Sequence, residues 1–217
     1  MIIVGICGGS GKSTFAERIR DGLSCSCEIM RLDCYYFDQG GKPFEERTKV
    51  NYDSPEIFDF DEMLADIRLL LDGKPVTRKG YNYAEHRRDD SEELMYPPEV
   101  LIIEGIHVFY DDRICDIMNL KLFIKVDSDI CLLRRIARDM NERGRSLESI
   151  SEQYKATVKP MREKYIDKYI DKADVVVMRG GMNEQALKTT ISYLKSCVKE
   201  QRPAESEKNE SDGNDSE

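Results

Sequence analysis

One segment near the N-terminus constrains the fold of this chain more than any other. An apolar run is followed by a glycine-rich turn and then by apolar residues at helical spacing. The run is Ile2–Ile6, the turn reads Cys7-Gly8-Gly9-Ser10-Gly11-Lys12-Ser13-Thr14, and the helical residues are Phe15, Ile19 and Leu23. Glycines let the backbone curl so that its N–H groups face inward, and a helix N-terminus adds positive potential. This order of strand, turn and helix therefore predicts a site for phosphate groups.

The turn departs from the strict phosphate-loop pattern, in which four residues separate the first glycine from Gly-Lys-Ser/Thr. That glycine would stand at the position of Ile6, and only two residues separate Gly8 from Gly11. Either the first strand slides by two residues, which keeps each side chain on its own face, or it stays and fewer amides face the phosphate. The sequence leaves both open, as it does a turn that binds nothing. In a working site, Lys12 supplies a point charge and Ser13 a hydroxyl for Mg²⁺.

The rest of the chain alternates apolar runs with helical patterns. Five runs are continuously apolar, which indicates strands buried on both faces. They are Ile2–Ile6, Glu28–Leu32, Val100–Ile103, Leu120–Val126 and Asp174–Met178. Apolar stripes within Phe60–Leu71, and at Ile130, Leu133, Ala137 and Met140, predict helices between them. Strands and helices in alternation predict an α/β fold, with a five-stranded parallel sheet, right-handed crossovers and helices on both faces.

Two segments differ from this pattern. The segment around 75–98 is polar, aromatic and rich in Pro and charge, which favours a β-hairpin or loop insertion. We expect it over the C-terminal edge of the sheet, where open α/β folds bind ligands. The segment Pro203–Glu217 has six acids, one Lys and no apolar residue larger than Ala. Such a tail cannot offset its ordering entropy by burial, so we expect one domain over about 1–200 followed by a disordered tail.

Composition excludes several classes of protein. The 217 residues include 42 Asp+Glu against 33 Lys+Arg, which argues against a dedicated nucleic-acid binder. No apolar run approaches the roughly 18–20 residues that span a bilayer, and the apolar N-terminal run is too short for a secretory signal. The seven cysteines are scattered and odd in number, unlike a disulfide framework. We therefore expect a reduced, cytoplasmic protein with no membrane or nucleic-acid partner.

Two carboxylates directly follow predicted strands. Asp33 follows Glu28–Leu32, and Glu104 follows Val100–Ile103, so both project at the carboxyl edge of the sheet. Beside a phosphate site, one could orient and deprotonate an acceptor hydroxyl while the other holds Mg²⁺ directly or through water. Each residue alone could equally be a turn or cap residue. Only the combination indicates phosphoryl transfer.

Five arginines gather in a short stretch of the third helical pattern and the segment behind it. A rotation of about 100° per residue brings Arg134, Arg135 and Arg138 together, opposite the apolar stripe. Arg143-Gly144-Arg145 follows, and the glycine could serve as a hinge. The pattern predicts a mobile lid over about 134–153 that neutralises a transferring phosphoryl group. The alternative is a solvated helix face on which Asp139 and Glu142 are the partners of the arginines.

The order of these motifs resembles the phosphoribulokinase/uridine kinase family of P-loop kinases, in particular its uridine–cytidine kinases. The resemblance extends from about Ile2 to Leu194 and covers nearly the whole predicted domain. Its blocks are Asp33-Cys34-Tyr35-Tyr36, Asn51-Tyr52-Asp53-Ser54-Pro55, Tyr81-Asn82-Tyr83, His86-Arg87, Ile103-Glu104-Gly105-Ile106, Arg134-Arg135-Ile136-Ala137-Arg138-Asp139, Glu142-Arg143-Gly144-Arg145, Gln153-Tyr154 and Arg179-Gly180-Gly181.

The resemblance implies a three-layer P-loop fold and transfer of the γ-phosphate of ATP or GTP to the 5′-hydroxyl of uridine or cytidine in pyrimidine salvage, with Mg²⁺. It also implies a homotetramer. Asp33 matches the catalytic aspartate, and Ser13 and Glu104 match the Mg²⁺ site. The glycine turn from Gly8 to Thr14 matches the nucleotide site, in which Lys12, Arg135 and Arg145 are phosphate-binding positions. Arg179–Gly181 matches a loop near the nucleotide base.

For the nucleoside, the resemblance implies a second group of residues. Asp53 and Arg138 match positions that hold the ribose hydroxyls. Tyr81 and His86 match hairpin residues that contact the pyrimidine, with Tyr83 nearby on the same hairpin. Gln153 and Arg143 match ligand contacts at the closing lid.

The turn is where this chain departs from the family, because related kinases carry two more residues between Ser10 and Gly11. The departure leaves a second hypothesis open, a nucleoside-binding homologue with impaired phosphoryl transfer. A third hypothesis is a related small-molecule kinase of the same group. Phosphoribulokinase itself is disfavoured, because a sugar-phosphate acceptor would favour more positive charge near Asp53.

Overall fold

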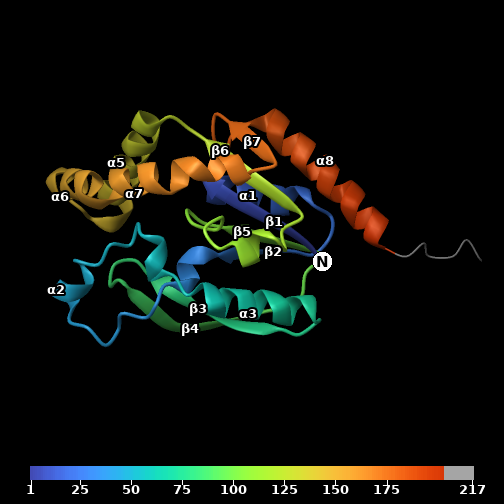
Figure 1. The fold of residues 1–217 in the computed structure, drawn as a ribbon, viewed down its shortest axis with the longest axis horizontal. Helices are drawn as coiled ribbons and strands as arrows, with labels where there is room; N and C mark the ends of the chain where they lie inside the picture. Colours follow the sequence, from blue (N-terminus) through green and yellow to red (C-terminus); the bar gives the residue numbers. More distant parts are fainter. Residues whose placement is uncertain (203–217) are drawn as a thin grey trace, which may run out of the picture.

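Five parallel strands in the order β2-β5-β1-β6-β7 form the central sheet of the computed structural model, which describes residues 1–202 (Figure 1). The strands are β1 (Ile2–Gly8), β2 (Cys27–Arg31), β5 (Val100–Glu104), β6 (Leu120–Lys125) and β7 (Val175–Met178). The five strands expected from the apolar runs are confirmed. The expected burial on both faces is wrong for β7, which lies at the edge of the sheet with Val175, Val176 and Met178 exposed. The tail expected to be disordered, 203–217, lies outside the described residues.

Helical segments connect the strands. The α-helices are α1 (Lys12–Gly22), α2 (Phe44–Arg47), α3 (Phe60–Leu71), α4 (Asp112–Cys115), α5 (Ser128–Arg143), α6 (Leu147–Gln153), α7 (Lys159–Lys164) and α8 (Glu184–Gln201). Shorter segments are the 3₁₀ turns η1 (Leu32–Tyr35), η2 (Pro55–Ile57) and η4 (Ile166–Lys172) and the π-helix η3 (Tyr154–Val158). Within residues 1–202, no helix combines the length and apolar character needed to cross a bilayer.

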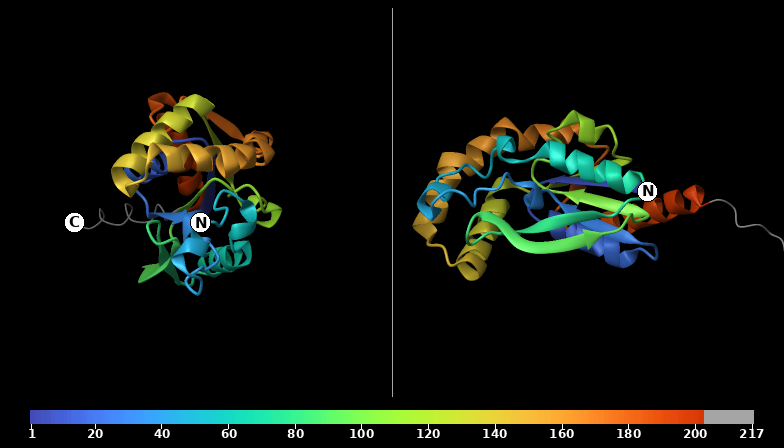
Figure 2. Two further views of the ribbon diagram at one scale, coloured as in Figure 1. Left: turned by 90° about the vertical axis from the view of Figure 1, so that its left-hand side faces the viewer. Right: turned by 90° about the horizontal axis from the view of Figure 1, so that it is seen from below.

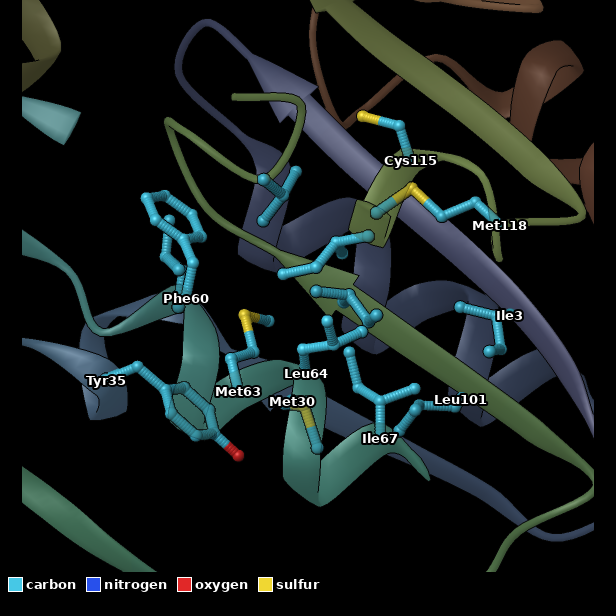
Figure 3. Packing of buried hydrophobic residues seen from close by; sticks show 14 of the residues in the cluster. Ile3, Met30, Tyr35, Phe60, Met63, Leu64, Ile67, Leu101, Cys115 and Met118 are labelled. Atoms are coloured by element: carbon cyan, nitrogen blue, oxygen red, sulfur yellow. The ribbon is translucent and has the colours of Figure 1, made fainter. Parts of the chain in front are cut away.

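The alternation of side chains along β1 divides the core into two layers. Ile2, Val4 and Ile6 belong to the layer covered by α1 and α8. Ile3 and Cys7 belong to the opposite layer, which is covered by α3, α4 and η4. Figure 3 shows the apolar side of α3 lying against the sheet in this second layer. Because helices cover both faces, the three-layer α/β architecture expected from the sequence is confirmed.

The segment around 75–98 contains an antiparallel hairpin of β3 (Val76–Asn82) and β4 (Arg87–Met95). Its base is anchored by Val76 and Met95, which are buried in the α3 layer. Arg78, 7% exposed, ties the hairpin to β2 by donating to the carbonyl of Ile29 (3.1 Å). The two views of Figure 2 place the turn of the hairpin at the end of the molecule that carries α5, α6 and α7.

The helix α5 forms as expected, but its apolar stripe does not pack on the sheet. Leu133 is 61% exposed and Met140 47%, whereas Asp139 is completely buried. In Figure 1, α5 extends past the end of the sheet, so no apolar layer is available for the stripe. The interior side of α5 is instead a cluster of charged groups, described below.

The two-layer core generates a stability test on α3. Ile67 is completely buried, whereas Leu69 on the same helix is 38% exposed. We expect Ile67→Ala to lower the free energy of unfolding by about 2–5 kcal/mol, because it leaves a cavity against the sheet. Leu69→Ala is the control and should change it by less than about 1 kcal/mol. Urea titrations followed by circular dichroism measure both, and equal effects would contradict this packing.

Candidate active site

The glycine turn links β1 to α1 through only three residues, because β1 pairs with β6 as far as Gly8. The N–H of Gly9 donates to the carbonyl of Ile124 (2.7 Å), and the N–H of Ser10 donates to Cys131 Sγ (3.5 Å). Both amides are therefore engaged by the chain itself. Of the two alternatives that the sequence left open, this geometry favours the smaller group of phosphate-facing amides.

The start of α1 supplies the amides that stay open. The first helical hydrogen bond runs from the N–H of Phe15 to the carbonyl of Gly11 (3.0 Å). A helix leaves its first four N–H groups without helical partners, and the amides of residues 11–14 make no hydrogen bond within the described chain. Lys12 Nζ lies 3.4 Å from the carbonyl oxygens of Gly8 and Gly9, so the ammonium group stays beside this helix end.

A second glycine loop, 179–181, packs directly on the turn. A Cβ on Gly181 would lie 2.2 Å from the carbonyl oxygen of Gly11, so the two loops meet backbone to backbone. Gly11 itself has φ +101°, a conformation that side chains disfavour. The loop that the resemblance associates with the nucleotide base therefore braces the shortened turn.

Ser13 and Glu104 come together behind the helix end. Ser13 Oγ donates to Glu104 Oε1 (2.9 Å), and Arg31 Nε lies 3.6 Å from the same oxygen. Burial raises the pKa of Glu104, Lys12 partly offsets this, and the charge of Asp33 raises it further. A hydroxyl and a carboxylate are the hard oxygen ligands that Mg²⁺ prefers, usually together with water and phosphate oxygens. The pair therefore suits Mg²⁺, whose charge would offset that of the buried carboxylate.

Asp33 lies in η1, immediately after β2, at the carboxyl edge of the sheet. Its Oδ2 accepts a hydrogen bond from the hydroxyl of Tyr83 on the hairpin (2.6 Å). Its Oδ1 accepts none from the residues that the structure describes. Arg143 of α5 lies over the ring of Tyr83, 4.7 Å from the ring centroid. The end of β2, the hairpin and α5 thus come together around this carboxylate.

Asp53 is held from three sides. Its carbonyl accepts from Nε2 of His107 (2.8 Å), its N–H donates to Asn51 Oδ1 (3.1 Å), and its Oδ2 accepts from the hydroxyl of Thr157 (3.0 Å). A carbonyl oxygen only accepts, so Nε2 of His107 carries the proton and Nδ1 accepts from the Tyr169 hydroxyl (3.0 Å). The π-helix η3 carries Thr157 to this position.

An aromatic cluster joins the hairpin to the end of η1 and to Tyr52, the neighbour of Asp53. The ring of His86 stacks on Tyr52, with centroids 4.9 Å apart and planes 20° apart. The ring of Tyr81 packs against those of Tyr36 and Tyr83, with ring centroids 4.7 and 5.2 Å apart. Burial lowers the pKa of His86, and Arg145, Arg47 and Arg143 lower it further. A neutral imidazole beside aromatic faces can both donate and accept a hydrogen bond.

Four arginines of α5 and of the segment behind it converge on one buried carboxylate. Asp139 is completely buried, and four guanidinium groups lie between 2.9 and 3.5 Å from it. These groups belong to Arg135, Arg138, Arg143 and Arg145. Gln153 Oε1 accepts from Arg135 (3.0 Å) and Arg145 (2.5 Å), which joins the end of α6 to the same cluster. Asp139 is thus the partner of these arginines that the sequence suggested, but it is buried rather than on a solvated face.

The residues named from the sequence form two groups, one around the glycine turn and one around Asp53 and the hairpin. Asp53 and Arg138, which the resemblance places together at the ribose, are not paired with each other. Arg138 pairs with Asp139 (2.9 Å), whereas Arg135, expected at phosphate, lies 3.7 Å from Asp53.

Sequence reasoning did not identify Thr157 and His107. Neither belongs to a motif named above, although His107 stands three residues after Glu104.

Comparisons with known proteins identify the family of this chain. The model of the phosphoribulokinase/uridine kinase family matches residues 2–186. The chain belongs to this family. It is therefore a phosphotransferase, and the resemblance seen in the motifs is confirmed. A uridine kinase from Ligilactobacillus salivarius is 41% identical over 91% of this chain and 94% of its own length. A uridine kinase from Streptococcus pyogenes serotype M5 is 42% identical over 92% of this chain and 97% of its own length.

Solved structures agree at the level of the fold. Phosphoribulokinase from Rhodobacter spheroides has a TM-score of 0.61 and 14% identity, and covers 82% of this chain and 69% of its own. D-glycerate 3-kinase from Cryptococcus neoformans has a TM-score of 0.52 and 13% identity. The match covers 84% of this chain and 87% of the kinase. These neighbours confirm the P-loop kinase fold.

The buried histidine generates a pH test. Burial lowers the pKa of His107 from 6.5 to about 4, so between these values the folded chain binds fewer protons than the unfolded chain. The contribution of His107 to the free energy of unfolding should therefore be fully present above about pH 6.5. It should fall by about 3 kcal/mol as the pH is lowered towards 4. His107→Gln should show a shallower fall in urea titrations across this range. Parallel curves for the two proteins would contradict the assignment.

Proposed function

We propose that this chain is a Mg²⁺-dependent uridine–cytidine kinase, which transfers the γ-phosphate of ATP or GTP to the 5′-hydroxyl of the nucleoside in pyrimidine salvage. Relatives named uridine kinase, 41–42% identical over more than nine-tenths of the chain, support it. One structural observation carries it. Asp33, with one carboxylate oxygen open, lies at the same sheet edge as the open amides of α1 and the Ser13–Glu104 pair.

On the phosphate side, Lys12 and the amides of residues 11–14 would bind phosphate oxygens of the donor. Ser13 and Glu104 would be the protein ligands of Mg²⁺, which neutralises charge on the phosphates. The arginines of the lid add positive charge around Gln153 and above Tyr83. Positioning and charge neutralisation are the main demands of a loose phosphoryl-transfer transition state.

On the acceptor side, Oδ1 of Asp33 would accept the hydrogen bond of the 5′-hydroxyl. The 5′-oxygen bonds to the γ-phosphorus, and the bond from that phosphorus to the bridging oxygen breaks and releases ADP or GDP. The hydroxyl proton passes to Asp33. Asp53 would accept from ribose hydroxyls in place of Thr157 and Arg135, and the neutral His86, with Tyr81, would recognise the pyrimidine edge.

The direct test is an ATP-dependent assay with uridine, cytidine and ribulose 5-phosphate side by side, in which ADP and the phosphorylated acceptor are both measured. We expect UMP and CMP and no ribulose bisphosphate. Phosphorylation of ribulose 5-phosphate alone would instead support a related sugar kinase of the same family.

The role of Asp33 is tested by Asp33→Asn. We expect kcat to fall by about 10²–10⁴-fold, because the amide cannot take the proton. The dissociation constant of uridine, measured by calorimetry, should stay within about twofold, since other residues hold the nucleoside. Asp38→Asn, on the exposed loop nearby, is the matched control. Undiminished turnover by Asp33→Asn would remove Asp33 from this role.

A second candidate function is nucleoside binding with impaired transfer. The observation that favours it is the engagement of the Gly9 and Ser10 amides by Ile124 and Cys131, which leaves fewer donors for the β-phosphate. Thermal-shift titration with uridine should stabilise the chain under either function. Only the working kinase should also release ADP and UMP.

Lengthening the turn tests this alternative. We expect insertion of Gly-Ser between Ser10 and Gly11 to leave kcat/KM for ATP unchanged or to raise it, because it frees backbone amides for phosphate. Steady-state kinetics with varied ATP measure the effect. A clear fall would mean that the short turn, braced by Gly181, is an adapted structure that the insertion disrupts.

The homotetramer and the cytoplasmic location stay predictions. The first comes from the family resemblance and the second from composition. Sedimentation velocity on the purified chain would measure the oligomeric state directly.

A further inference from the structure

We propose that Tyr83 is a positioning residue for Asp33: its hydroxyl holds one oxygen of the carboxylate, so that the other faces the acceptor hydroxyl. This inference rests on the proposed function, because it names what orients the proton acceptor of that reaction. It assigns Tyr83 a different task from the nucleoside contact that the resemblance implied.

The hydrogen bond itself is the first observation. The Tyr83 hydroxyl lies 2.6 Å from Asp33 Oδ2, in the range of strong hydrogen bonds to carboxylates. A carboxylate only accepts, so the phenol is the donor. Burial raises the pKa of Tyr83, and the charge of Asp33 raises it further. The phenol therefore keeps its proton at neutral pH and stays a donor throughout turnover.

The second observation is what each oxygen of Asp33 can do. With Oδ2 occupied by Tyr83, the carboxylate cannot rotate freely about its last bond without breaking this hydrogen bond. Oδ1 accepts no hydrogen bond from residues 1–202 and is open to an incoming hydroxyl. A phosphoryl acceptor must be aligned with the phosphorus before transfer, so a fixed carboxylate contributes to the rate rather than to nucleoside affinity.

The third observation concerns the ring of Tyr83. Arg143 lies over one face at 4.7 Å, and Tyr81 contacts the ring in an edge-on geometry at 5.2 Å. Arg143 also pairs with Asp139 (3.3 Å). Contacts thus run from the lid carboxylate through Arg143 and Tyr83 to Asp33. The ring is already engaged by the lid, which favours a link between lid and carboxylate over a platform for the base.

Tyr83→Phe is the decisive variant, because it removes the hydroxyl and keeps the ring beneath Arg143. Tyr83 is 41% exposed, so the change should leave the melting temperature within about 2 °C. We expect kcat with uridine to fall by about 10–100-fold, as for the loss of one hydrogen bond to a charged group. The dissociation constant of uridine should stay within about twofold. Tyr96→Phe, just past the end of β4 and 65% exposed, is the matched control and should change neither value.

Two outcomes would overturn the proposal. A raised dissociation constant of uridine with unchanged kcat would assign the hydroxyl to the nucleoside, and no change in either would leave it without a role.

A readout without turnover separates this proposal from the proposed function. In protein carrying ¹³Cζ-labelled tyrosine, the resonance of Tyr83, assigned by its loss in Tyr83→Phe, should move when Asp33 is replaced by Ala. Its titration should also move to lower pH, because the neighbouring negative charge is gone. If the wild-type chain makes no UMP, the proposed function fails. An unmoved resonance instead overturns the Tyr83–Asp33 contact.

Discussion

The parallel pairing of β2 with β5 and of β5 with β1 brings three strand ends to one edge of the sheet. Parallel strands buried on both faces have to be continuously apolar, so polar groups can follow only where each strand stops. The glycine turn, Asp33 and Glu104 occupy those three positions. Each strand is locked in register by two apolar layers, so the relative placement of these groups depends on the core rather than on flexible loops.

Four arginines of α5 and the segment behind it surround one buried carboxylate, that of Asp139. A carboxylate removed from water is costly unless it is paired, and Asp139 is paired with four arginines. One of these arginines, Arg135, also lies 3.7 Å from the carboxylate of Asp53. Burial lowers the pKa of His86, and the charges of Arg145, Arg47 and Arg143 lower it further. Arg143 and Arg145 therefore act both on the buried carboxylate and on the hairpin.

Neighbouring elements hold the shortened glycine turn in place. Two amides of the turn bond to β6 and to Cys131 of α5, and the loop at Gly181 lies against Gly11 with no room for a side chain. A longer turn would hold its shape through its own curled backbone, whereas this one is held by neighbouring elements. The open donors are consequently confined to the start of α1.

Apolar periodicity and glycine placement act between residues close in the chain, so they predicted the five strands, the helices α1, α3 and α5, and the carboxylates at the strand ends. They did not predict α8, which covers one face of the sheet. The sequence also determined which arginines share a helix, but not that Asp139 lies inside their cluster with the apolar side of α5 turned to solvent. Which distant atoms come into contact is visible only in the folded chain. The Tyr83 hydroxyl reaches Asp33 across 50 residues, and Thr157 reaches Asp53 across 104. Such contacts depend on how whole layers pack, and no local pattern in the sequence carries that information.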